Sequence, residues 1–148
     1  MKKKELLVAA IENGTVIDHI PTDKVFQVMS LLHLEAATSA VTVGFNLKSQ
    51  NMGLKSIIKI ADKYFDDKEL NQLAVVCPNL TLCIIRDYEI VEKKPVTLPR
   101  ELHGILRCTN PRCITNNEPM RTRFAVSGST LTCHYCNNAS EIAEAQFT

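Results

Sequence analysis

The sequence lacks the short motifs that most often mark an active site. It contains neither the G-x-S-x-G turn of serine hydrolases nor the glycine-rich phosphate loop of P-loop proteins. The G-x-G-x-x-G dinucleotide fingerprint and the H-E-x-x-H zinc motif are also absent. Because these motifs are absent, the sequence gives no support to a catalytic role, and we expect a chain that is not itself an enzyme.

Charge of one sign is not in excess. The chain has 17 Lys and Arg against 16 Asp and Glu, which gives a formal net charge of +1 at pH 7. Zinc-containing modules that bind nucleic acid usually carry a pronounced basic stripe. A nucleic-acid-binding zinc ribbon therefore stays the weaker alternative, which tight and steeply salt-dependent duplex binding would support.

Long hydrophobic runs are missing as well. No stretch is long enough to cross a bilayer, and the charged segment Met1–Leu7 leads into an apolar run too short for a convincing signal peptide. We therefore expect no membrane association and a cytoplasmic location. In such a reducing compartment cysteines stay available as thiols.

Aromatic residues are scarce in the last fifty or so positions, where Phe124, Tyr135 and Phe147 are the only ones. A core this small rarely holds itself together, and a bound metal is the usual remedy. Removing such a metal is expected to unfold this part of the chain, because binding and folding then share their free energy.

Four cysteines in this segment have the spacing of a metal site. They form two close pairs, C-x4-C and C-x2-C, separated by nineteen residues, at Cys108, Cys113, Cys133 and Cys136. Each pair turns the chain so that two sulfurs face one ion, and zinc accepts four thiolates without redox chemistry. Ordinary buried thiols and two disulfides are the alternatives. We predict one zinc ion per chain.

Four cysteine ligands leave no open position on the metal, whereas catalytic zinc keeps one for water or substrate. The site is therefore predicted to be structural. An enzyme that uses a reactive thiol or a zinc-bound thiolate is the competing interpretation, and a closed shell of four sulfurs predicts no such activity.

Composition divides the chain into two parts. Up to Lys94 there are eleven Lys and one Arg, whereas from Pro95 onward there are five Arg and no Lys. The segment 93–99 carries two prolines and is typical of a hinge. We place the domains at residues 1–97 and 98–148.

The first domain shows an alternating order of strands and helices. Strands are expected at 6–11, 15–20, 41–47, 54–60 and 80–86, with a possible continuation at 88–92, and helices at 22–32 and 66–77. Asn13-Gly14 between the first two strands favours a hairpin. The order from Thr15 predicts an α+β fold, a ferredoxin-like antiparallel sheet with two helices on one face. A small, all-β, zinc-bound domain follows it.

Several cations of the first domain could meet. Lys55 and Lys59 share a face of their strand, about 13 Å apart at about 3.3 Å per residue. With Lys93 and His19 they could form a polyphosphate site, although a solvated lysine face is the simpler interpretation. Asp18 and His19 are neighbours on a strand and should point to opposite faces, which is poor geometry for acid–base catalysis.

These residues carry a family resemblance. The segments 14–21 (GTVIDHIP), 52–60 and 87–89, together with the cysteine spacing, resemble the regulatory chain of aspartate carbamoyltransferase. The similarity covers nearly the whole chain in the same order. Each motif alone is weak, but the combination is highly specific.

The resemblance implies a two-domain regulatory subunit in de novo pyrimidine biosynthesis. Its first domain would bind CTP and UTP as inhibitors and ATP as an activator, all at one site. Its zinc domain would hold catalytic chains. The resemblance also implies homodimers through the first domains, with three dimers joining two catalytic trimers in a dodecamer.

The resemblance assigns site residues by position. Asp18, with backbone groups near Ile11 and Tyr88, would read the base, and Lys59 the ribose and base region. His19, Lys93 and Lys55 would face the triphosphate, while Val16 and Ile90 pack around the nucleoside. Asn110, Arg112 and Glu118 would contact the catalytic chain, with Arg107, Arg121 and Arg123 as further candidates. The chain departs from the family pattern at Glu5 and Cys83.

Overall fold

A computed structural model of the chain describes residues 10–50 and 53–148. The chain divides into two compact units, and the division falls between Thr97 and Leu98. The strand expected at 6–11 lies outside the described residues except for Ala10 and Ile11, and neither of these is in a strand.

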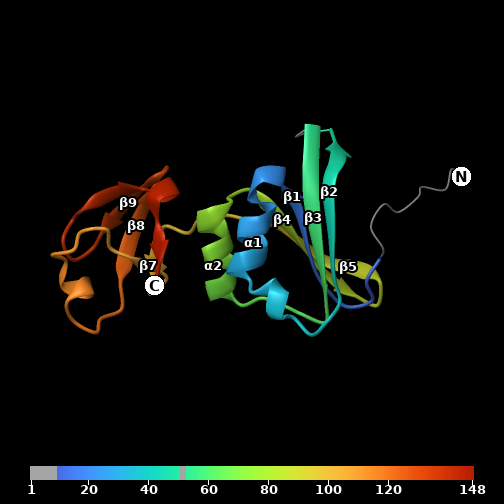
Figure 1. Cartoon of the computed structure of the whole chain (residues 1–148), viewed down its shortest axis with the longest axis horizontal. Helices are drawn as coiled ribbons and strands as arrows, with labels where there is room; N and C mark the ends of the chain where they lie inside the picture. The colour runs from blue at the N-terminus through green and yellow to red at the C-terminus, as the bar shows by residue number, and fades with distance from the viewer. Residues whose placement is uncertain (1–9, 51–52) are drawn as a thin grey trace, which may run out of the picture. The chain divides into compact units, whose positions relative to one another are not determined.

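The first unit is built on a five-stranded antiparallel sheet (Figure 1). Its order is β2-β3-β1-β4-β5, in which β1 is Gly14–Ile20, β2 Val41–Ser49, β3 Gly53–Ala61, β4 Leu80–Arg86 and β5 Glu89–Val96. The strand order expected from Thr15 is confirmed, and β5 adds an edge strand. Because β5 continues to Val96, most of the predicted hinge is strand.

Two helices, α1 (Val25–Leu31) and α2 (Asp67–Val76), pack against the same face of this sheet (Figure 1). The alternation along β3 explains which face they cover, since Ser56, Ile58 and Ile60 are buried while the residues between them are partly exposed. Short 3-10 turns, η1 (Thr22–Lys24) and η2 (Leu34–Ala36), flank α1. The opposite face carries no helix among the described residues.

A capping box starts α2. The Asp66 carboxylate accepts a hydrogen bond from the Glu69 backbone N–H (2.8 Å), and the Glu69 carboxylate accepts one from the Asp66 N–H (3.3 Å).

At the start of β1, Gly14 has φ +141° and a side chain there would collide with the Ile60 carbonyl oxygen. Glycine is therefore required where β1 enters the sheet.

The second unit is a small β structure, as expected. A four-stranded sheet has the order β10-β9-β8-β6, and β11 pairs with β7. The strands are β6 Glu101–His103, β7 Leu106–Arg107, β8 Arg123–Ser127, β9 Thr130–Cys133, β10 Ala139–Glu141 and β11 Gln146–Phe147, with 3-10 turns η3 Ile114–Asn116 and η4 Ile142–Glu144. Its core includes Leu102, Ile105, Leu106, Phe124 and Leu131, together with three cysteines. Among the described residues no helix is long and apolar enough to span a bilayer.

Candidate effector cavity and metal centre

A row of side chains crosses the helix-free face of the first sheet. Strand pairing places Val16 opposite both Lys59 on β3 and Cys83 on β4, and Cys83 opposite Lys93 on β5. Directly paired residues share a face of a sheet. The row therefore runs Lys59, Val16, Cys83, Lys93, with a cation at each end and buried apolar groups between them.

A cavity of about 320 Å³ lies over this row. Ten residues line it: Ala10, Ile11, Val16, Asp18, Lys59, Cys83, Ile85, Tyr88, Ile90 and Lys93. Seven of the nine residues that the resemblance assigned to nucleotide contacts are among them. Lys55 and His19 do not line the cavity but lie beside Asp18. Ala10 and Ile85 were missed, although the alternation of β4 could have indicated Ile85.

A β-bulge shapes one end of the cavity. The register between β1 and β3 shifts between Ile17 and Ile20, and His19 has a left-handed backbone with φ 61°. The His19 N–H donates to the Asp18 carboxylate (2.7 Å), and its ring Nδ1 lies 4.0 Å from the other carboxylate oxygen. The expectation that Asp18 and His19 point to opposite faces was therefore wrong, because the bulge interrupts the alternation.

Asp18 interacts with charged groups beside the cavity. Burial raises the pKa of the Asp18 carboxyl, but hydrogen bonds from Lys55 and the His19 N–H outweigh it and hold the pKa below its usual value. Burial lowers the pKa of the Lys59 ammonium, and the charge of Asp18 only partly opposes this. Lys55 and Lys59 of β3 therefore both interact with the Asp18 carboxylate, while Lys93 lies at the other end of the row, on β5.

The turn between β4 and β5 forms the rim of the cavity. Asp87 and Tyr88 both have positive φ, 52° and 66°, as the central residues of a type I′ turn do. Backbone N–H groups of the two residues donate to the Asn13 side chain (3.2 Å) and the Glu12 carbonyl (2.9 Å). Tyr88 as a whole residue stays 66% exposed, so it is available to a ligand.

In the second unit, the four predicted cysteines converge. Their sulfur atoms all lie within 4.8 Å of one another, with Cys108–Cys136 at 3.6 Å and Cys113–Cys133 at 3.7 Å. A disulfide would require about 2.05 Å. Four sulfurs about 2.3 Å from one ion at tetrahedral corners lie about 3.8 Å apart, so this spacing fits a tetrahedral metal site.

The pKa values of these thiols also indicate that a cation is needed for all four to ionise. Burial and the neighbouring cysteines raise the pKa of Cys108 to about 12. Burial opposes ionisation of Cys136 too, but hydrogen bonds from the Asn138 N–H and the Asn110 side chain lower its pKa to about 7. Four crowded thiols cannot all ionise without a positive partner, which a divalent metal would supply.

The residues expected to contact another chain lie in the first cysteine loop and just after it. Arg112 and Glu118 are exposed, and Asn110 is partly buried. The Asn110 side chain accepts a hydrogen bond from the Arg112 N–H (3.0 Å), so it also organises the loop. Two apolar side chains of the same region, Ile114 and Met120, are 50% and 37% exposed.

Fold and sites together define a class of protein. The chain joins an α+β unit with a cation-lined cavity to a β unit organised by a closed four-cysteine cluster. Comparison with known families agrees with both parts. Residues 6–97 match the family described as "Aspartate carbamoyltransferase regulatory chain, allosteric domain", and residues 100–146 match "Aspartate carbamoyltransferase regulatory chain, metal binding domain".

Several relatives named "Aspartate carbamoyltransferase regulatory chain" are similar over almost their whole length. The Parabacteroides distasonis protein is 58% identical over 138 residues, which cover 91% of this chain and 90% of the relative. The Bacteroides thetaiotaomicron protein is 54% identical over 145 residues (96% and 95%), and that of Pyrococcus abyssi 44% over 145 residues (95% and 95%). The chain therefore belongs to the family of aspartate carbamoyltransferase regulatory chains. It is a regulatory, non-catalytic subunit with an allosteric and a metal-binding domain.

Proposed function

We propose that the chain senses cytoplasmic nucleotide pools for pyrimidine biosynthesis, binding CTP and UTP as inhibitors and ATP as an activator in the cavity of the first unit. The row Lys59, Val16, Cys83, Lys93 carries this proposal. At about 4.8 Å between strands, its two lysines start about 14 Å apart on one face. Cations on both sides of an apolar floor suit a ligand with an aromatic base and a polyphosphate.

Each group of residues at or beside the cavity has a role in this proposal. Lys93, His19 and Lys55 face the triphosphate, since several converging cations are needed to hold its charge. Lys59 lies at the ribose and base region, and Val16 and Ile90 pack around the nucleoside. Asp18, with backbone groups near Ile11 and Tyr88, reads the edge of the base.

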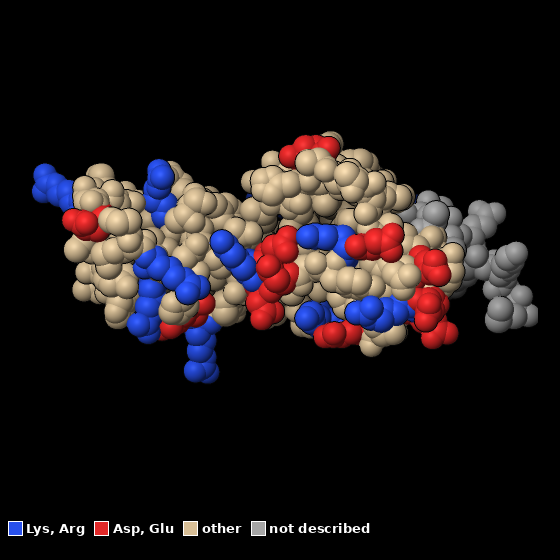
Figure 2. Space-filling model, turned by 90° about the horizontal axis from the view of Figure 1, so that it is seen from below, with Lys and Arg blue, Asp and Glu red and all other residues tan. Residues whose placement is uncertain are grey.

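The distribution of charge supports a local anion site in place of a nucleic-acid surface. On the face drawn in Figure 2, lysines and arginines of the first unit are interspersed with aspartates and glutamates. Nucleic-acid binding usually requires a basic stripe. The lysines that matter here gather instead around one cavity.

The four-cysteine cluster is proposed to hold one structural zinc ion through Cys108, Cys113, Cys133 and Cys136. Zinc suits this donor set because it takes four thiolates in a tetrahedral shell. The ion would supply folding free energy to the second unit. That unit would then present Asn110, Arg112 and Glu118 to a catalytic chain, with Ile114 and Met120 as apolar contacts.

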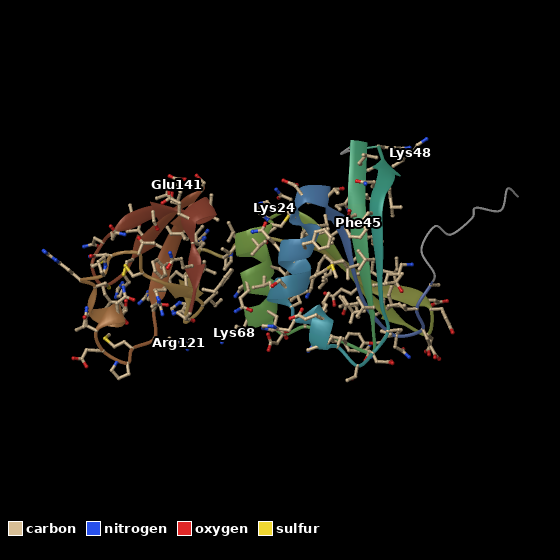
Figure 3. All side chains as sticks on the ribbon, viewed as in Figure 1. Lys24, Phe45, Lys48, Lys68, Arg121 and Glu141 are labelled. Carbon is tan, nitrogen blue, oxygen red and sulfur yellow. The ribbon has the colours of Figure 1, made fainter. Side chains whose placement is uncertain are left out.

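Pairing of two chains is proposed to use strand β2, one edge of the first sheet. Phe45 of β2 and Phe26 of α1 have ring centroids 5.4 Å apart, yet they are 40% and 69% exposed. Phe45, which belongs to β2, is labelled in Figure 3. The other edge, β5, carries charged residues and Pro95, which discourage pairing. Three such dimers would join two catalytic trimers.

Regulation would be a population shift. A nucleotide changes the activity of the assembly only through its different affinity for two quaternary states. Competition among CTP, UTP and ATP for one cavity makes the base the element that decides the sign of the effect.

Calorimetric titration of the isolated chain tests the proposed cavity. CTP and ATP should bind competitively and without turnover, and Lys59→Ala and Lys93→Ala should each weaken binding roughly 10- to 100-fold, the loss of one charged hydrogen bond. Lys68→Ala is the matched control, because Lys68 lies on α2, away from the cavity (Figure 3). Unchanged affinity in both cavity variants would refute this site.

A further inference from the structure

Both cysteine loops of the second unit contain backbone hydrogen bonds, and the longer loop is also held by side chains that follow it. In the short loop, backbone bonds join the Cys133 N–H to the Asn138 carbonyl (3.0 Å) and the Asn137 N–H to the Cys133 carbonyl (2.9 Å). The loop from Cys108 to Cys113 has four residues between its cysteines, and one backbone bond joins the Cys113 N–H to the Asn110 carbonyl (3.0 Å). A longer loop has more conformations to lose when its two sulfurs are fixed.

Asn116 connects the beginning of the longer loop to turn η3, which follows the loop. The Nδ2 group of Asn116 donates to the carbonyl of Cys108 (2.8 Å) and to that of Asn110 (2.8 Å). Asn116 belongs to turn η3, which follows the second cysteine of the loop directly. A single side chain therefore fixes the backbone on both sides of Thr109.

The neighbouring residues hold the other half of the loop. The Asn117 side chain donates to the carbonyls of Pro111 (3.2 Å) and Cys113 (2.9 Å). The Thr115 hydroxyl lies 3.1 Å from the Cys113 sulfur. A metal-bound thiolate has no proton, so the hydroxyl would have to be the donor.

We propose that Thr115, Asn116 and Asn117 are positioning residues of the metal site, and that they set how long the chain retains its metal. Asn116 and Asn117 fix the loop so that both of its sulfurs stay directed at the ion, and Thr115 stabilises the Cys113 thiolate. Groups that orient metal ligands typically change metal affinity 10- to 100-fold. The inference rests on the proposed zinc site.

Metal-release kinetics of the zinc-loaded full chain test this inference. With an excess of a chromogenic chelator, Thr115→Val, Asn116→Ala and Asn117→Ala should each release zinc roughly 10- to 100-fold faster than the parent chain. Thr130→Val on β9 and Asn71→Ala on α2 are matched controls outside the loop, and their release rates should not change.

A spectroscopic measurement separates a role at the metal from a general loss of stability. Thr115→Val keeps the shape of the side chain but removes the donor, so the sulfur-to-metal charge-transfer band of the Co²⁺-loaded chain should shift. Thr115→Ser should restore both the band and the slow release. Parent-like release rates in all three loop variants, or a failure of Thr115→Ser to restore them, would overturn the inference. A parent chain that binds no zinc would refute the zinc site itself.

Discussion

The ammonium of Lys55 lies 2.8 Å from the carboxylate of Asp18, and only 20% of each side chain is exposed. The pair joins β1 to β3 at the bulge beside the cavity, where His19 adopts its left-handed backbone. A left-handed non-glycine residue costs about 1–3 kcal/mol, and surrounding contacts must hold it in place. Asp18 supplies such contacts, because its carboxylate accepts a hydrogen bond from the His19 N–H and pairs with the Lys55 ammonium.

Asp18→Asn should lower the free energy of unfolding of the first unit by about 1 kcal/mol at pH 7. Because folding lowers the pKa of Asp18, its contribution is complete above the usual pKa of an aspartate. It disappears as the pH falls through the lowered value. Urea unfolding followed by NMR signals of β1 at several pH values would measure this difference.

The exposed pair Glu92–Lys94 provides the control for that prediction. Its atoms are 3.6 Å apart and its side chains are 56% and 42% exposed, so Glu92→Gln should change stability very little. Equal effects of Asp18→Asn and Glu92→Gln, at every pH, would show that the Asp18–Lys55 pair has no special role.

Nucleotide affinity should begin to fall at a lower pH than it would if Lys59 had the usual pKa of a lysine. Lys59 must be protonated to attract a ligand anion, and burial lowers the pKa at which it loses that proton. Lys59→Arg keeps a positive charge at every accessible pH, so its CTP affinity should be flatter between neutral and alkaline pH. Parallel pH profiles for the two proteins, measured by calorimetry, would contradict this role of Lys59.

Removal of the metal should unfold the second unit and leave the first unit folded. The two units have separate cores, and the metal site lies entirely in the second. After treatment with a chelator, NMR signals of residues 98–148 should collapse to the narrow range of an unfolded chain, and Cys133→Ser should have the same effect. Persistence of dispersed signals from Phe124 and Leu131 would argue against a structural metal.

Phe45→Lys should convert dimers of the chain to monomers. It places a charge on the exposed edge strand β2, where an approaching strand would bury it. Val91→Lys on β5 is the control, because Val91 is exposed like Phe45 (55% against 40%) but lies at the other edge of the sheet. Sedimentation velocity distinguishes the two species. A Phe45→Lys dimer as stable as the parent would exclude this edge as the interface.

Periodicity in the sequence was sufficient for the architecture of the first unit. The alternation of Ser56, Ile58 and Ile60 fixes the buried face of β3, and the acidic residues before Leu70 mark the start of α2. The sequence could not show the bulge at His19, because the regular alternation it assumes places neighbouring side chains on opposite faces. Only pairing with β3 reveals the irregular register.

Spacing also predicted the cysteine cluster, since two close pairs can meet around one ion in few ways. The hydrogen bonds by which the Asn116 and Asn117 side chains hold the Cys108–Cys113 loop were not predictable. Asparagine is common in loops, and its bonds to the Cys108 and Cys113 carbonyls depend on the folded path of the chain. Ile85, in contrast, lies two residues from Cys83 on β4, so the alternation of the strand could have indicated it.

A titration of the isotopically labelled full chain with CTP, followed by NMR, tests the central claim most directly. The account predicts saturable shifts centred on Val16, Lys59, Cys83 and Lys93, which ATP reproduces by competition. Shifts confined to other surfaces of the chain, or none at all at millimolar CTP, would contradict it.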